Sequence, residues 1–384
     1  MTRILKFLCI ISLLVGIPML GMVLSGSPLS PYLSFPPTTT YAEPNSFSWV
    51  VFAILSLLLT GALLPFVLRF IDFSTSKGKT LSGMNFPWWG WGGLGILLLS
   101  WTLAWTRFPW FHPFQDHTFT PLWIGYILVI NALSVKQTRQ CLLTEKPFFY
   151  LSLFPISAVF WWIFEFLNRF VQNWYYLGSQ ELTPTTYFFS ATIPFSTVLP
   201  AVVGTSEYLR SFPRLRQPYQ NCWKFPIPEG RGFGVANLLV ACIGLMGIGL
   251  WPNLLYPLLW VSPLLILLGL QRILGERSLL EDIGKGNWSP VVIPALAGLI
   301  CGFFWEMWNY YSLAHWKYII PYVQGIHIFE MPLLGYLGYL PFGITCIVCV
   351  QFLLGQSSSP KLPDHLRSGI KFWEFQNSTS KVQI

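Results

Sequence analysis

The chain has 384 residues, of which 53% are hydrophobic and 10% are charged, whereas a soluble domain carries about 25% charged residues. This composition excludes a soluble globular enzyme and a disordered chain. The formal net charge is +8, but the basic residues fall in alternate polar segments between long apolar runs. That distribution is typical of membrane-protein loops, so the lipid bilayer is the predicted partner and nucleic acid is not.

Ten apolar segments are long enough to cross a hydrocarbon core about 30 Å thick as α-helices, which predicts an all-α integral membrane protein. We expect the spans at about residues 4–24, 48–70, 88–106, 119–135, 147–168, 185–209, 234–252, 254–272, 288–310 and 332–355. A cleaved signal peptide is the alternative for the first segment. Its apolar run is longer than a typical signal core, and no A-x-A cleavage site follows it, which favours a retained helix.

Basic residues orient these spans. All but three of the 23 lysines and arginines fall in one set of alternate segments, and the exceptions are Arg107, Arg169 and Lys317. Because positive charge marks cytoplasmic loops, we expect a multi-pass protein of the cell membrane with both termini in the cytoplasm. Short loops and the lack of an organelle presequence in the printed chain favour a bacterial inner membrane.

Two segments of the chain resemble each other. Residues 160–176 and 303–318 each contain an aromatic run, a Glu, an Asn three residues later and then Trp-x-Tyr, and a Leu-Pro pair follows 34 and 35 residues after each Glu. The pattern predicts two N-terminal helices in 1–87, a four-helix unit in 88–210, a second copy of it in 232–350 and a polar cytoplasmic tail in 356–384. Four crossings per unit make the two repeats parallel. Coincidence in a chain rich in Trp and Phe is the alternative.

The repeated Glu and Asn residues are the main candidate site. Glu165 and Glu306 lie near the outer ends of their spans, and the Asn at i+3, Asn168 or Asn309, shares a helix face with its Glu. A carboxylate within a span is costly and usually functional, so we expect both glutamates to serve as acid, base or binding groups in one outward-facing cavity. The alternative is a structural role, with Arg169 at i+4 neutralising Glu165.

Tryptophans gather around these two carboxylates, which predicts an aromatic pocket for a substrate. Besides the two asparagines, the residues expected to contact that substrate are Trp162, Trp174, Trp305, Trp316, Arg169 and His315. An aromatic belt at the depth of the lipid headgroups is the alternative, but a belt is expected at both interfaces.

Histidines of the segment FHPFQDHTF are the only metal candidates that the sequence offers. His112, Asp116 and His117 are residue types that bind zinc or iron, but their spacing fits no known signature, so we predict no metal site. No Walker loop, dinucleotide-binding glycine motif or zinc-protease helix occurs either, so the sequence assigns no cofactor.

Three functions remain open from the sequence, and only the first two place a ligand in the site. The first is a Trp-rich carboxylate pocket in the outer third of the bilayer that binds or acts on a lipid-linked or amphipathic substrate. The second is a transporter whose repeats rock around the shared Glu and Asn residues, and the third is a non-catalytic subunit of a membrane complex. A polar path leading inward from the glutamates favours transport, whereas a pocket closed beneath them favours an enzyme or a receptor.

Overall fold

The computed structural model describes residues 1–39, 41–43, 45–74, 85–178 and 182–355. This part of the chain is mostly helical and contains two small two-stranded sheets. In chain order, its elements are α1 (Arg3–Leu24), α2 (Ser30–Leu33), α3 (Trp49–Ser74), α4 (Trp88–Trp105), η1 (Pro109–His117), α5 (Phe119–Thr138), α6 (Leu142–Glu145), α7 (Pro147–Val171), β1 (Trp174–Tyr176), α8 (Pro184–Phe195), α9 (Val198–Arg210), α10 (Pro213–Arg216), η3 (Gln217–Tyr219), α11 (Arg231–Gly247), α12 (Pro252–Leu255), α13 (Leu258–Ile273), α14 (Leu279–Gly284), α15 (Ser289–Tyr310), β2 (Trp316–Tyr318), β3 (His327–Ile328), β4 (Met331–Pro332), η4 (Leu333–Gly338) and α16 (Tyr339–Leu354).

Many of these helices have the length and composition of membrane spans. Within the described residues, seven segments qualify, namely α1, α3, α5, α7, α8 with α9, α15, and η4 with α16. The apolar helices α11 and α13 are shorter, and α4 has 18 residues. The prediction of a mostly helical chain with membrane-length apolar helices is confirmed, and it indicates a multi-pass protein in a lipid bilayer.

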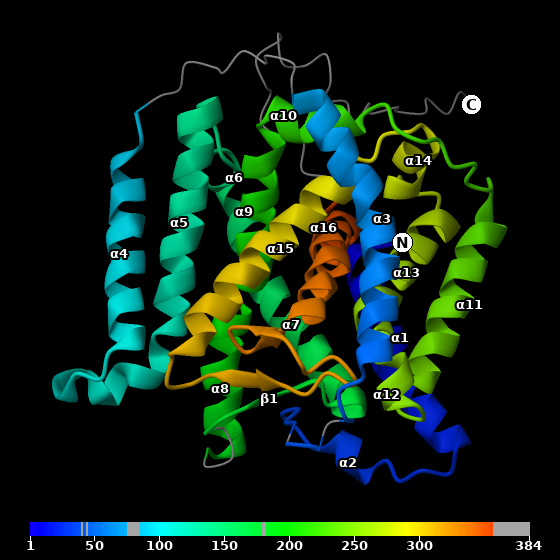
Figure 1. The fold of residues 1–384 in the computed structure, drawn as a ribbon, viewed down its shortest axis with the longest axis horizontal. Coiled ribbons are helices and arrows are strands. Elements are labelled where there is room, and N and C mark those ends of the chain that lie inside the picture. The colour runs from blue at the N-terminus through cyan, green and yellow to red at the C-terminus, as the bar shows by residue number, and fades with distance from the viewer. Residues whose placement is uncertain (40, 44, 75–84, 179–181, 356–384) are drawn as a thin grey trace, which may run out of the picture.

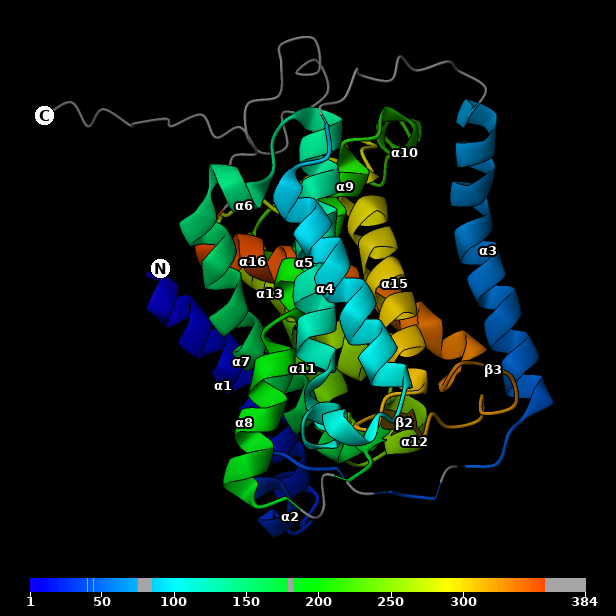
Figure 2. The ribbon, with the colours of Figure 1, turned by 90° about the vertical axis from the view of Figure 1, so that its left-hand side faces the viewer.

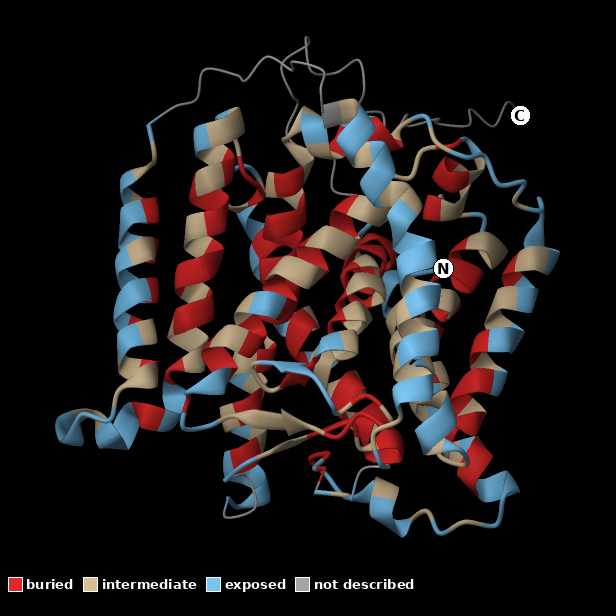
Figure 3. Cartoon of the chain, in the orientation of Figure 1, coloured by how far each residue is buried: buried red, intermediate tan, exposed pale blue. Residues whose placement is uncertain are grey.

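The long helices run between two ends of the molecule (Figures 1 and 2). One end carries α6, α10 and α14, and the opposite end carries α2, α12 and the β1 strand (Figure 1). Helix α3 stands at the edge of the bundle, apart from the central helices (Figure 2), and none of its most apolar stretch is buried. Figure 3 shows the contrast between this exposed helix and the buried central ones. The predicted cytoplasmic tail, 356–384, lies outside the described residues.

Helix packing follows the same pattern in two parts of the chain. Helix α4 packs on α5, and α9 packs on α5 and α7. Further along, α11 packs on α13, and α16 packs on α13 and α15. The close approach of α15 to α16 requires Gly298 and Gly343, because a side chain at either position would overlap the backbone of the other helix. Such small residues at crossings are typical of membrane helices.

Strands β1 and β2 connect these two parts. They pair antiparallel, with Trp174 opposite Tyr318, Tyr175 opposite Lys317, and Tyr176 opposite Trp316. Each strand follows the long helix that carries the Glu and Asn of its segment, α7 or α15. The C-terminal ends of the two similar sequence segments therefore lie side by side in this sheet, and β1 lies toward the α2 end of the molecule (Figure 1).

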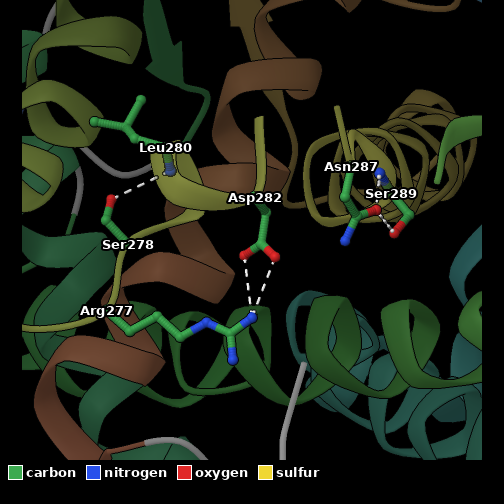
Figure 4. Close-up of polar contacts among 6 residues, drawn as sticks. All are labelled: Arg277, Ser278, Leu280, Asp282, Asn287 and Ser289. Carbon is green, nitrogen blue, oxygen red and sulfur yellow. Dashed lines mark hydrogen bonds and ion pairs between the residues drawn. The ribbon is translucent and has the colours of Figure 1, made fainter. Parts of the chain in front are cut away.

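A polar turn at the opposite end fixes the start of α15 (Figure 4). The Arg277 guanidinium donates to the Asp282 carboxylate at 3.1 Å, and Ser278 caps α14. The Asn287 Oδ1 accepts from the backbone N–H and the hydroxyl of Ser289, at 3.2 and 2.6 Å. Burial raises the pKa of the Asp282 carboxyl despite this arginine.

Candidate functional site

A cavity of about 690 Å³ lies where β1 and β2 meet the helices that flank them. Its volume is in the range of about 300 to 1,000 Å³ that is usual for small-molecule sites. Most of its wall is aromatic, and the rings that line it belong to Phe119, Trp161, Trp174, Tyr176, Tyr187, Phe195, Trp260, Trp305, Trp316, Tyr318 and Tyr339. The remaining lining is mainly small or apolar, with a few polar groups: Asp116, His117, Thr186, Ser190 and His315.

Glu165 holds one side of this wall from behind. Its Oε1 accepts hydrogen bonds from the Trp161 indole at 2.8 Å, the Trp174 indole at 3.0 Å and the Tyr176 hydroxyl at 2.7 Å. All three donor rings line the cavity, whereas Glu165 is only 1% exposed. The carboxylate therefore lies one side chain behind the cavity surface and fixes the orientation of three rings.

Glu306 holds another part of the cavity wall from behind in the same way. Its Oε1 accepts from the hydroxyls of Tyr318 at 2.6 Å and Tyr339 at 2.5 Å. The Trp316 indole donates to the Tyr318 oxygen at 2.7 Å and so joins the network indirectly. Glu306 is fully buried, and its three aromatic partners line the cavity. Two buried carboxylates thus order two aromatic walls of a single cavity.

The strand tyrosines keep their protons in this setting. Burial raises the pKa of Tyr176 and Tyr318 well above the usual phenol range, and the neighbouring carboxylates Glu165 and Glu306 raise it further. Each phenol therefore remains a neutral donor whose hydrogen is directed at a carboxylate.

Asn168 and Asn309 fasten the strands to the helices that precede them. The Asn168 amide donates to the Trp174 carbonyl at 2.7 Å, and its oxygen accepts from the Asn173 N–H at 2.8 Å. The Asn309 amide donates to the Trp316 carbonyl at 2.8 Å, and its oxygen accepts from the N–H of the same residue at 2.9 Å. Both asparagines are fully buried, behind the wall and not on it.

Other residues expected at the site fall into two groups. Trp174, Trp305, Trp316 and His315 line the cavity. Trp162 is not among the lining residues, and its indole donates to the Thr192 hydroxyl of α8 at 2.9 Å.

Arg169 also lies away from the cavity. Among the described residues, its hydrogen bonds go to the segment before α3, at the Tyr32 carbonyl (2.8 Å), the carbonyl and hydroxyl of Ser34, and the Pro36 carbonyl (3.0 Å). It therefore anchors the N-terminal segment and is not hydrogen-bonded to Glu165.

The three residues considered as metal ligands do not all lie at the cavity. Asp116 and His117 of η1 line the cavity, whereas His112 does not. Across the described ranges, no group of three or more His, Cys, Asp or Glu side chains is placed to hold a metal ion.

Several cavity residues had no role assigned from the sequence. Tyr176 and Tyr318 belong to the repeated Trp-x-Tyr pattern, which was a usable signal. Tyr339, Trp260 and Ser190 lie far along the chain from either Glu, and only the packing of α8, α13 and α16 brings them to the site.

A second layer of aromatic side chains packs behind the cavity wall. Phe342, one turn beyond Tyr339 on α16, is fully buried and contacts the rings of Trp161, Trp260 and Trp305 at centroid distances of 5.6, 5.8 and 6.0 Å. Phe164 packs against Phe342 at a centroid distance of 5.5 Å.

Comparison of the chain with known protein families, with curated proteins and with solved structures finds no match.

Proposed function

We propose that this protein binds or acts on an amphipathic or lipid-linked ligand in a pocket of the outer third of the bilayer. One observation carries the proposal: a cavity of about 690 Å³ has aromatic walls that two buried glutamates hold in place. Rings fixed in this way offer apolar contact area to a ligand at little cost in conformational entropy. The few polar groups of the lining would orient its head.

The proposed topology has ten spans with both termini in the cytoplasm. Within the described residues, seven helical segments of membrane length lie at seven of these spans, and the helices α4, α11 and α13 lie at the other three. Positive-inside orientation assigns the end with α6, α10 and α14 to the cytoplasm, because the segments around them carry most of the basic residues. The cavity, near β1 and β2, is then on the outer side.

The proposed duplication of 88–210 in 232–350 is supported by equivalent contacts. In both units a Glu on the long helix accepts from ring donors, and an Asn one turn later fastens the following strand. The two strands pair around Tyr175 and Lys317, as expected for copies related by a two-fold axis along the membrane normal.

We assign different roles to the candidate residues. Glu165 and Glu306 act as positioning carboxylates for the walls, and Asn168 and Asn309 hold the strands. Trp174, Trp305, Trp316 and His315 are the candidates for direct contact with the ligand, and Tyr176, Tyr318 and Tyr339 join them. Trp162 and Arg169 stabilise α8 and the N-terminal segment.

Aromatic packing behind the cavity wall favours binding or catalysis over transport. A transporter requires a path toward the cytoplasm, and its site usually lies near the middle of the bilayer. Phe342 and Phe164 fill the space behind the wall of the cavity, and both side chains are at most 1% exposed.

Mass spectrometry of small molecules that copurify with the full chain tests the proposal. A Ser190→Trp variant fills the cavity from α8. Phe189→Trp places the same side chain on the neighbouring residue, which is 61% exposed and not part of the lining. We expect an amphiphile with the wild type and with Phe189→Trp, reduced about tenfold in Ser190→Trp. Equal content in all three would contradict the pocket and favour a non-catalytic subunit.

A Glu165→Gln, Glu306→Gln double variant extends the same measurement to the walls. A neutral amide oxygen accepts hydrogen bonds more weakly than a carboxylate. We therefore expect reduced copurification in a protein that still folds. Unchanged content would limit both glutamates to a role in stability.

A further inference from the structure

Acidic side chains lie at the cavity surface and directly behind its walls. Its lining contains the carboxylate of Asp116 but, among the described residues, no Lys or Arg side chain. Directly behind the walls lie Glu165 and Glu306, and the second oxygen of each carboxylate is buried without a hydrogen-bond partner in the described part of the chain. The guanidinium of Arg169 is directed at the segment before α3. The described lining also contains two histidines, His117 and His315.

Aromatic rings form a connected wall around the same space. Trp161 contacts Phe195 and Trp305 at centroid distances of 6.0 and 6.4 Å, and Trp305 contacts Tyr339 at 5.8 Å. Trp174 and Trp260 pack together at 5.6 Å. An ammonium group within about 6 Å of such rings is attracted to their negative faces, most strongly where water is excluded.

Several hydrogen-bond donors of the wall are already used. The indole N–H groups of Trp161 and Trp174 and the hydroxyl of Tyr176 donate to Glu165, and the hydroxyl of Tyr339 donates to Glu306. A phosphate or carboxylate head would lie close to Asp116 of the lining and to the two glutamates behind the walls.

We propose that the ligand of this cavity carries a cationic head of the ammonium class, quaternary or protonated. The aromatic faces hold the head, and Glu165 and Glu306 supply negative potential from behind them. The inference deepens the proposed function and rests on it.

Three amphiphiles with one alkyl chain and different heads test the inference. We would titrate octyltrimethylammonium, octyl glucoside and octyl phosphate, each below its micelle concentration, into the full chain in a neutral maltoside detergent and measure binding by calorimetry. Ser190→Trp, with its cavity filled, provides the blank for partitioning into detergent. We expect the cation to bind about fivefold to thirtyfold more tightly than the glucoside, and the phosphate more weakly than either.

A pair of Trp→Leu variants separates ring faces from apolar volume. Trp260 lines the cavity, whereas Trp162 does not. Trp260→Leu should weaken binding of the cation about fivefold and leave the glucoside nearly unchanged. Trp162→Leu should change neither affinity.

The outcomes distinguish the two proposals. Equal affinity for cation and glucoside, or tightest binding of the phosphate, would overturn the cationic head and leave the pocket in place. Loss of cation and glucoside affinity to the same extent in Trp260→Leu would also overturn it. Binding of all three at the Ser190→Trp level would overturn the pocket itself, and with it the inference.

Discussion

The two glutamate clusters share a sequence pattern but obtain their hydrogen-bond donors differently. Glu165 receives all three of its donors from residues 161–176, that is, from its own helix and the next strand. Glu306 receives one from its own strand, Tyr318, and one from α16, Tyr339. One cluster is assembled locally, whereas the other depends on a contact between residues 33 positions apart.

A reciprocal change in side-chain size accounts for this difference. Four residues before Glu165 is Trp161, whereas four residues before Glu306 is Gly302. The Tyr339 ring lies directly against Gly302 and occupies the space that a side chain there would need. At the position of Tyr339, 33 residues after the Glu, the first unit has the smaller Val198. Each buried carboxylate needs aromatic hydrogen-bond donors, and the donor ring can come from its own helix or from a neighbouring helix.

The largest expected effect comes from breaking this size relation. Gly302→Trp forces an indole into the Tyr339 ring, and we expect it to cost about 3 kcal/mol or to prevent folding. Adding Tyr339→Val recreates the arrangement of the first unit and should recover at least half of the loss. Thermal unfolding in detergent measures both, and Gly95→Trp, at a position with open space around it, serves as the control. No recovery in the double variant would argue against the reciprocal relation.

The asparagines allow a comparison of the two strands. Asn168→Ala and Asn309→Ala each leave backbone groups of a strand without their partner, at about 2 kcal/mol. Asn168 also donates to the Thr39 hydroxyl at 3.0 Å, so its loss should cost about 1 kcal/mol more. The two melting temperatures check this order, and equal values would show that the Thr39 contact contributes nothing.

A smaller difference is expected between the strand tyrosines. Tyr318 both donates to Glu306 and accepts from Trp316, whereas Tyr176 supplies one of three donors to Glu165. We expect Tyr318→Phe to cost about 2 kcal/mol and Tyr176→Phe about 1 kcal/mol. Melting temperatures of the two variants and of wild type check this, and the reverse order would contradict the relay through Tyr318.

The smallest effect concerns the β3–β4 hairpin. This hairpin is the element that follows β2, whereas β1 is followed by α8. His327 in this hairpin contacts Gln324 at 2.9 Å, and burial lowers its pKa. A lowered pKa favours the neutral ring in the folded state, so this contribution to stability is present above about pH 6.5 and is lost as the pH falls. Hydrogen exchange of the hairpin should therefore be faster at pH 5.5 than at pH 7.5, after correction for intrinsic exchange.

His327→Gln provides the control for this measurement. A glutamine side chain does not titrate, so the corrected difference between the two pH values should disappear in the variant. A difference of the same size in wild type and variant would assign the pH dependence to another group.

The sequence alone determined the membrane class, the helix positions and the proximity of Glu to Asn. These properties are local, because a span is set by consecutive apolar residues and the 3.6-residue period places i and i+3 on one face. The tertiary structure decided that Glu165 and Glu306 face aromatic donors behind the cavity wall, and that Tyr339 and Trp260 complete it. Those contacts join helices that are distant in the sequence. Which helices come into contact depends on small residues, such as Gly302, that let two helices approach closely.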